Sequence, residues 1–108
     1  MSKTARFAVA LTAAVLFAGA AGFAQSSGEA TYKARCQSCH GAQGVPNPGI
    51  AKVMGVKPAS DPAVKAHTVA QMIEITTNGK APHMPAFKGK LSDSQIKESV
   101  EYFRTLMK

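Results

Sequence analysis

Two segments of the chain alternate apolar and polar residues with the period of an amphipathic helix. In the first, Thr68 and Gln71 have the spacing of a capping box, which marks a helix start. Asn78-Gly79 provides a stop signal, so we predict a helix that begins at Thr68 and ends there. Its apolar face consists of Val69, Met72, Ile73 and Thr76.

The second amphipathic helix is predicted near the end of the chain. Ser92 and Gln95 form another capping box and mark its start. Its apolar residues recur at helical spacing and should face the core. They are Ile96, Val100, Phe103, Leu106 and Met107.

A third main helix is predicted before these two, from about Ser26 to about His40. Ser26 and Ser27 are good N-cap residues, and Glu29 places an acid in the first turn. The residues that follow are good helix formers as far as the first cysteine.

The remaining segments are rich in glycine and proline, which favour loops. Residues 41–49, 55–62 and 80–91 are predicted as loops, and residues 50–54 as one or two helical turns. No strand pattern and no internal repeat is visible. The predicted fold class is therefore all-α, with three main helices and a short one.

The N-terminal 24 residues have the pattern of a secretory signal. Lys3 and Arg6 precede an acid-free apolar stretch that ends in small residues at Ala24. We predict that residues 1–24 are a signal peptide and that residues 25–108 form one domain exported to the periplasm. The alternative is an uncleaved membrane anchor, because 18 helical residues would span about 27 Å. The stretch is Ala/Gly-rich and only weakly apolar, which favours the signal.

Composition indicates that the exported domain needs help to form a core. The chain has 108 residues, and removal of the signal leaves 84 with a formal charge of +5, no Trp, two Tyr and two Phe. Domains this small often depend on disulfides, a metal or a cofactor. The two cysteines would close a loop too short to constrain the unfolded chain much. A cofactor is therefore expected to fill the interior.

The segment Cys36-Gln-Ser-Cys39-His40 matches C-x-x-C-H, the attachment motif of c-type haem. Two thiols three positions apart at a helix end can form thioethers with the two vinyl groups on one side of a porphyrin. The adjacent imidazole of His40 can then coordinate the iron. We therefore predict one covalently bound haem c.

Three other interpretations of this motif fit the chain less well. A thioredoxin-like redox pair requires a βαβ context, which the helical pattern does not supply. A zinc site needs four ligands, and the motif supplies three without a second C-x-x-C. A structural disulfide in a chance match is the third alternative, but a secretory signal delivers the chain to the compartment where haem is attached.

Met84 is the predicted second axial ligand of the iron. It precedes Pro85 in a loop between two predicted helices, where an extended residue can reach the opposite face of a haem. His83 as ligand, or an open sixth position, are the alternatives.

The other methionines and His67 are less suited to this role. Met72 lies on an apolar helix face and is predicted to be core, Met54 is in a short segment, and Met107 is at a fraying end. His67 precedes the capping Thr68 and is predicted to be a solvated surface histidine.

Three segments together resemble a bacterial class I cytochrome c of the small soluble monohaem kind. They are C-x-x-C-H, the loop His83–Ser92 with its Met-Pro-Ala-Phe stretch, and the helix Ile96–Leu106. The resemblance covers nearly all of residues 26–108. It implies the cytochrome c fold around a covalent haem, with His40 as proximal and Met84 as distal ligand.

The resemblance also implies how the helices cross and what supports the proximal ligand. Gly28 and Tyr32 should meet the last helix near Tyr102, with Gly28 permitting close backbone approach. A proline carbonyl usually accepts a hydrogen bond from the proximal imidazole in this family, and both Pro46 and Pro48 could supply it.

Lysines are predicted to surround the haem edge. Lys80, Lys88 and Lys90 flank Met84, and Lys52 and Lys57 lie in the other long loop region. Such a ring would steer the protein toward redox partners with acidic docking surfaces. The alternative is an ordinary solvated surface. Nucleic acid is not an expected partner, because export separates the protein from it and haem propionates reduce the positive charge.

With both axial positions filled, the iron has no vacancy for oxygen or peroxide. We therefore predict an exported monomeric one-electron carrier, not an enzyme, which contacts redox proteins and, peripherally, membrane complexes. The alternatives are a haem enzyme or gas sensor with an open or displaceable sixth position, and a dedicated subunit of one larger enzyme.

Overall fold

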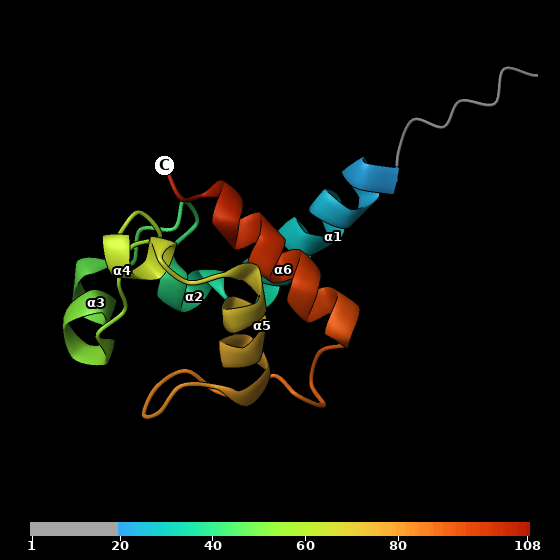
Figure 1. The fold of residues 1–108 in the computed structure, drawn as a ribbon. Coiled ribbons are helices and arrows are strands. Elements are labelled where there is room, and N and C mark those ends of the chain that lie inside the picture. The colour runs from blue at the N-terminus through green and yellow to red at the C-terminus, as the bar shows by residue number, and fades with distance from the viewer. Residues whose placement is uncertain (1–19) are drawn as a thin grey trace, which may run out of the picture.

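In the computed structural model, residues 20–108 are described, and they form six helices (Figure 1). These are α1 (Ala20–Arg35), α2 (Gln37–His40), α3 (Pro48–Met54), α4 (Pro62–Lys65), α5 (Val69–Asn78) and α6 (Asp93–Thr105). No strand occurs among these residues, which contain only two isolated β-bridges. The all-α prediction is confirmed, with three short helices beside the three long ones where one had been predicted.

The predicted start of the first helix is wrong. Instead of beginning at Ser26 or Ser27, α1 begins at Ala20. Residues 20–24 are mostly alanine, which has the highest helix propensity and outweighs the capping preference of the serines. Residues 1–19, most of the predicted signal, lie outside the described residues.

The predicted end of this helix is also displaced. Regular helix stops at Arg35, Cys36 has φ −117° and ψ −36°, and α2 then continues to His40. Backbone hydrogen bonds bridge the break, because the Cys36 amide donates to the Tyr32 carbonyl (2.8 Å) and the His40 amide to the Cys36 carbonyl (2.9 Å). The C-x-x-C-H segment is therefore held as a helical extension of α1.

Both predicted capping boxes are present. The Gln71 amide donates to Thr68 Oγ1 (3.1 Å) and the Thr68 amide to Gln71 Oε1 (2.8 Å). Ser92 and Gln95 make the same reciprocal pair at the start of α6. The starts of α5 and α6 thus follow from local side-chain chemistry.

The two proline-initiated helices depart from the prediction. Asn47 caps α3 and Asp61 caps α4, each accepting a hydrogen bond from a backbone amide of the first turn (2.9 and 2.8 Å). Proline at the first helical position is favourable, because its missing N–H would have no partner there. The first of these helices starts two residues before the predicted position 50, and the second was not predicted.

Helix α6 packs against α1 and α5 (Figure 1). Gly28 permits the crossing, since a Cβ there would overlap the carbonyl group of Glu98, with its carbonyl carbon at 2.8 Å. One turn later the rings of Tyr32 and Tyr102 pack with centroids 5.2 Å apart. The crossing implied by the resemblance is confirmed.

The core of the described residues lies where these helices meet and around the loop before α6. The predicted apolar faces supply much of it, with the rest coming from α1 and the loops. The buried apolar residues are Tyr32, Ala59, Met72, Phe87, Ile96 and Val100. Each helix within residues 20–108 is too short or too polar to cross a bilayer.

Candidate functional site

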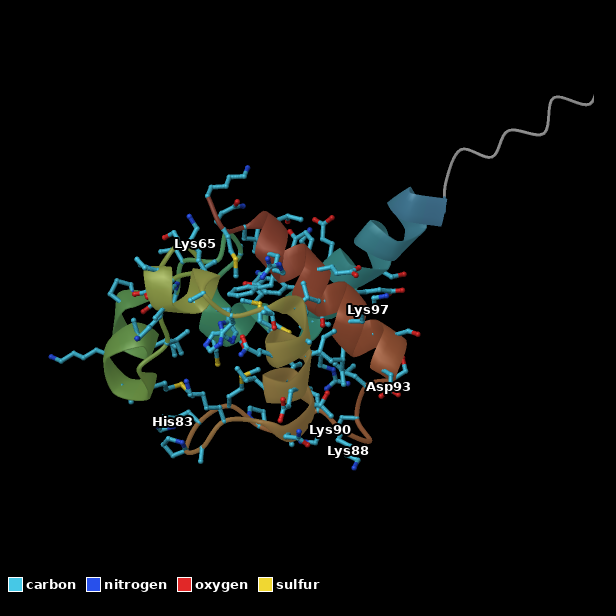
Figure 2. All side chains as sticks on the ribbon, viewed as in Figure 1. Lys65, His83, Lys88, Lys90, Asp93 and Lys97 are labelled. Carbon is cyan, nitrogen blue, oxygen red and sulfur yellow. The ribbon has the colours of Figure 1, made fainter. Side chains whose placement is uncertain are left out.

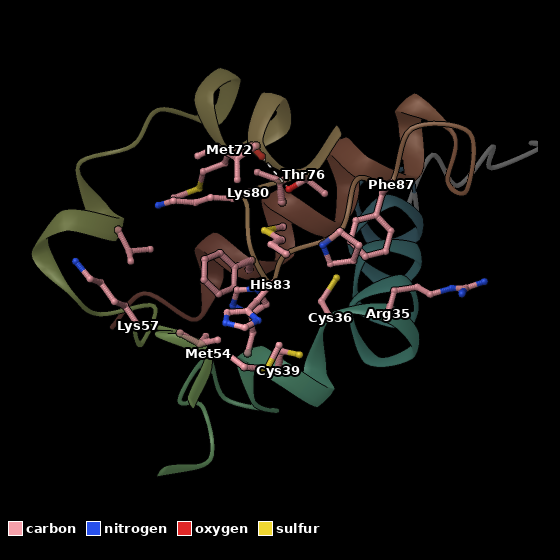
Figure 3. Close-up of a pocket in the computed structure, with 18 of the residues that line it drawn as sticks. Arg35, Cys36, Cys39, Met54, Lys57, Met72, Thr76, Lys80, His83 and Phe87 are labelled. Carbon is pink, nitrogen blue, oxygen red and sulfur yellow. Dashed lines mark hydrogen bonds between the residues drawn. The ribbon is translucent and has the colours of Figure 1, made fainter. Parts of the chain in front are cut away.

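A cavity of about 510 Å³ lies between the segment Tyr32–His40, the end of α3, α4, α5 and the loop before α6. Its volume falls in the range of about 300–1,000 Å³ that is typical of ligand and cofactor pockets. Figure 3 shows Cys36 and Cys39 on one side of this space and Met72 and Thr76 on the other. The cavity therefore separates the C-x-x-C-H segment from α5.

Cys36, Cys39 and His40 line one wall of the cavity. Both cysteines are half-buried free thiols. The backbone bonds across Cys36 and the glycine at position 41, which ends α2 with φ +83°, fix the short helix that carries them. The structure thus brings the three residues of the predicted attachment motif to one surface.

Burial sets the protonation of this wall. Burial lowers the pKa of His40 below its ordinary value, which favours the neutral imidazole whose nitrogen lone pair can coordinate a metal. Burial and the neighbouring Cys39 raise the pKa of the Cys36 thiol to about 11. At neutral pH the Cys36 thiol and the His40 imidazole are therefore uncharged.

Met84 lines the same cavity from the loop between α5 and α6. Lys80 and Met84 exchange backbone hydrogen bonds (2.9 and 3.0 Å), which closes the loop between them. The Phe87 amide donates to the Thr76 carbonyl (3.1 Å), and the Phe87 side chain is 8% exposed. Met84 is thus held on both sides, half-buried, while His83 is exposed and also lines the cavity.

The prediction for His67 is wrong, and that for Met72 is incomplete. Instead of being a solvated surface residue, His67 is half-buried and lines the cavity, and its carbonyl accepts a hydrogen bond from Arg104 (3.0 Å). Met72 is buried as predicted but also lines the cavity, with its sulfur 3.8 Å from the Arg104 guanidinium. Met54 lines it as well.

Sequence reasoning did not assign several apolar and small side chains to this site. Val100 and Phe103 were predicted as core, and the structure shows that this part of the core is also cavity wall. The other unassigned lining residues include Tyr32, Val56, Ile75, Thr76 and Ser99. Periodicity could mark an apolar face, but it could not tell a face packed on protein from one packed on a cofactor.

Three cationic side chains line the cavity, and one of them, Arg35, is an exposed residue of α1. Lys57 and Lys80 line it and are exposed. Lys52, Lys88 and Lys90 are exposed but do not line it. Figure 2 shows Lys88 and Lys90 in the loop that precedes α6 and Lys97 on α6 itself.

The donor set and the lining fit a haem. Two thiols, a neutral imidazole and a thioether converge on one largely apolar cavity, and these groups can attach and coordinate an iron porphyrin. Within residues 20–108, no three His, Cys, Asp or Glu side chains gather as a metal-ligand cluster. The zinc alternative therefore has no ligand set in that part of the chain.

Comparison with known proteins identifies the family. The model of the family described as cytochrome c oxidase, cbb3-type, subunit III, matches residues 23–103. The chain belongs to this cytochrome c family. The cytochrome is 35% identical over 80 residues to cytochrome c6 of Leptolyngbya boryana. The aligned region covers 71% of this chain and 86% of the relative. Cytochrome c6 of Bumilleriopsis filiformis is also 35% identical, over 79 residues, with 70% and 84% covered.

A solved structure agrees with these relatives. The KustC0563 c-type cytochrome superposes on this cytochrome with a TM-score of 0.68 at 28% identity, covering 75% of this chain and 98% of that one. The cytochrome is a monohaem electron carrier, not an enzyme, and it binds haem c covalently. Its partners are redox proteins.

Proposed function

We propose that this cytochrome is an exported one-electron carrier in which Cys36 and Cys39 attach the haem, and His40 and Met84 are its axial ligands. The observation that carries the proposal is the shared cavity, which these four residues line from two separate segments. The haem iron supplies the chemistry when bound, a change of valence by one electron.

Each residue has a distinct part in this proposal. The two thioethers keep the cofactor from dissociating, and the neutral imidazole of His40 donates its lone pair. The hydrogen-bonded loop between Lys80 and Met84 holds the methionine sulfur toward the cavity, which reduces the movement that accompanies electron transfer. Apolar walls exclude water and so limit solvent reorganisation.

Pro46 is the proposed acceptor for the hydrogen bond from the proximal imidazole. It is buried and follows the Gly41–Val45 turn directly after His40. Pro48, by contrast, is exposed at the first position of α3. A buried carbonyl beside the imidazole would fix its orientation and raise its donor strength.

Replacing Met84 tests the distal ligand. The haem-loaded Met84→Ala protein should lose the weak near-infrared sulfur-to-iron band, have a lower reduction potential and bind carbon monoxide when reduced. Met72→Leu and Met54→Leu remove the other two thioethers that line the cavity and should retain the band. An unchanged band in Met84→Ala would remove Met84 from the site.

The same measurement separates the alternatives for the sixth position. If His83 were the ligand, His83→Ala rather than Met84→Ala would change the spectrum. If the position were open, as in a gas sensor, the unmodified reduced protein would bind carbon monoxide readily at neutral pH.

The lysines at the cavity are proposed to steer acidic partners toward the haem. Lys57→Glu and Lys80→Glu should slow reduction of ferricyanide, an anionic oxidant, and the slowing should diminish as salt is added. Lys97→Glu makes the same charge change on α6, away from the cavity lining, and serves as control. Equal slowing by all three variants would indicate a net-charge effect only.

Export is proposed from the N-terminal sequence. Residues 1–24 would be removed and residues 25–108 would remain as a periplasmic monomer that contacts redox proteins and, peripherally, membrane complexes. The intact mass of the exported protein should show the loss of 24 residues and the gain of one haem. A mass that retains residues 1–24 would favour an anchor.

A second candidate is a dedicated subunit of a larger oxidase. The match to the family described as subunit III of a cbb3-type oxidase supports it. Purification of the native protein distinguishes the two, because a carrier leaves the membrane fraction as a free monomer and a subunit copurifies with the other chains.

A further inference from the structure

The hydroxyl of Tyr32 contacts the backbone immediately after His40. Tyr32 is 1% exposed, and its hydroxyl donates a hydrogen bond to the carbonyl of Gly41 at 2.6 Å. Burial raises the pKa of Tyr32 well above its usual value, so the hydroxyl remains a donor. A phenyl ring without the hydroxyl would fill nearly the same space. The hydroxyl therefore adds a specific polar contact.

This contact clamps the turn that follows α2. The Gly41 carbonyl also accepts a longer hydrogen bond from the Gly44 amide (3.2 Å), and the Gly44 carbonyl accepts one from the Ala59 amide (2.8 Å). Gly41 has φ +83°, a backbone conformation that favours glycine. Because glycine is conformationally free, the hydrogen bonds around it must hold this turn in place. The hydrogen bond from the Tyr32 hydroxyl is the shortest of the three and connects the turn to α1.

The ring of Tyr32 reaches His40 by a second route. It stacks on Phe103 with centroids 6.1 Å apart, and the Phe103 ring meets the His40 ring edge-on at 5.4 Å. The backbone and the imidazole of His40 are therefore both connected to the same tyrosine, one through Gly41 and the other through Phe103.

We propose that Tyr32 is a positioning residue for His40, and that its hydroxyl fixes the orientation of the proximal imidazole and thereby the reduction potential of the haem. The inference rests on the proposed ligand role of His40. Loss of the hydroxyl would loosen the turn that carries Pro46 and so weaken the hydrogen bond proposed above between the imidazole and the Pro46 carbonyl. A weaker bond makes the imidazole a poorer electron donor, which favours the reduced iron.

The test compares haem-loaded Tyr32→Phe with Tyr102→Phe. Tyr102 packs on the Tyr32 ring, but its hydroxyl takes no part in the contact with Gly41. Tyr32→Phe should raise the reduction potential and change the hyperfine-shifted proton resonances of the haem methyls and the His40 ring in the ferric protein. Its unfolding equilibrium constant should rise roughly two- to tenfold, as expected for one lost hydrogen bond. Tyr102→Phe should retain the resonances and potential of the unmodified protein.

A stability loss in Tyr32→Phe without a change in potential or resonances would overturn the proposal, because it would assign the hydroxyl a structural role only. Should Tyr32→Phe not fold, 3-fluorotyrosine can be incorporated at Tyr32 in the Tyr102→Phe background. The fluorinated phenol keeps the ring and the hydroxyl but is a stronger donor, so the potential should fall, and an unchanged potential would equally overturn the proposal. Failure of the proposed function would appear separately, as an unmodified protein without His/Met coordination.

Discussion

Replacing Gly28 by alanine should weaken the packing of α1 on α6. A Cβ at this position would overlap the carbonyl oxygen of Glu98 and lie 2.8 Å from its carbon, whereas ordinary contact begins at 3.4 Å. Both atoms belong to the backbone of α6, so no side-chain rotation can relieve the overlap. The two helices must separate, and the Tyr32–Tyr102 contact one turn away must loosen with them.

Two opposing effects set the magnitude. Alanine is favoured over glycine inside a helix by about 0.5–1 kcal/mol. Overpacking a close contact costs about 1–3 kcal/mol, and a backbone overlap belongs near the upper end of that range. The net loss in the free energy of unfolding is therefore about 1–2 kcal/mol, which is roughly a five- to thirtyfold larger unfolding constant.

Denaturant unfolding of the haem-loaded proteins measures this loss. Ala30→Gly lies exposed on the same helix and reports the propensity effect alone, a loss of about 0.5–1 kcal/mol. A Gly28→Ala protein as stable as the unmodified protein, or more stable, would show that the helices do not meet as described.

Three other substitutions probe the capping box, the loop and the surface. Ser92→Ala removes the acceptor of the capping box and should lower the free energy of unfolding by about 1 kcal/mol in denaturant titrations, whereas an unchanged midpoint would contradict a stabilising cap. Phe87→Ala should lower the free energy of unfolding by about 3–4 kcal/mol and also weaken the near-infrared band, because the buried ring helps to hold the Met84 loop. A full-strength band would show that the ring stabilises the fold without positioning Met84. Lys33→Ala should leave the melting temperature unchanged, since its ion pair with Glu29 is exposed, and a clear decrease would show that the pair stabilises α1.

Helix ends that are set by nearby side chains were predictable from the sequence. The capping boxes at Thr68 and Ser92 and the glycine at position 79 act within one helical turn, so the residues that form them are close in sequence. The C-x-x-C-H segment is local in the same way. Its three functional residues share a cavity wall because a short helix places them there.

Features that depend on distant contacts were not predictable. His67 has an ordinary position before a capping residue, and only the fold brings it to the cavity with its carbonyl bonded to Arg104. The start of α1 was also misplaced, since the serine caps compete with an alanine-rich segment before them. For Met84 the sequence offered an extended position before a proline, but the loop that holds it depends on Phe87 reaching α5.

The packing of α1 on α6 joins the beginning of the described chain to its end. Such a contact links residues far apart in the sequence, and it cannot form until the last helix has reached the compartment where the chain folds. Cys36 and Cys39 follow α1 directly, so their segment lacks this packing partner until α6 docks. The thiols would therefore be accessible for haem attachment before the fold closes, and docking of α6 would enclose the modified site.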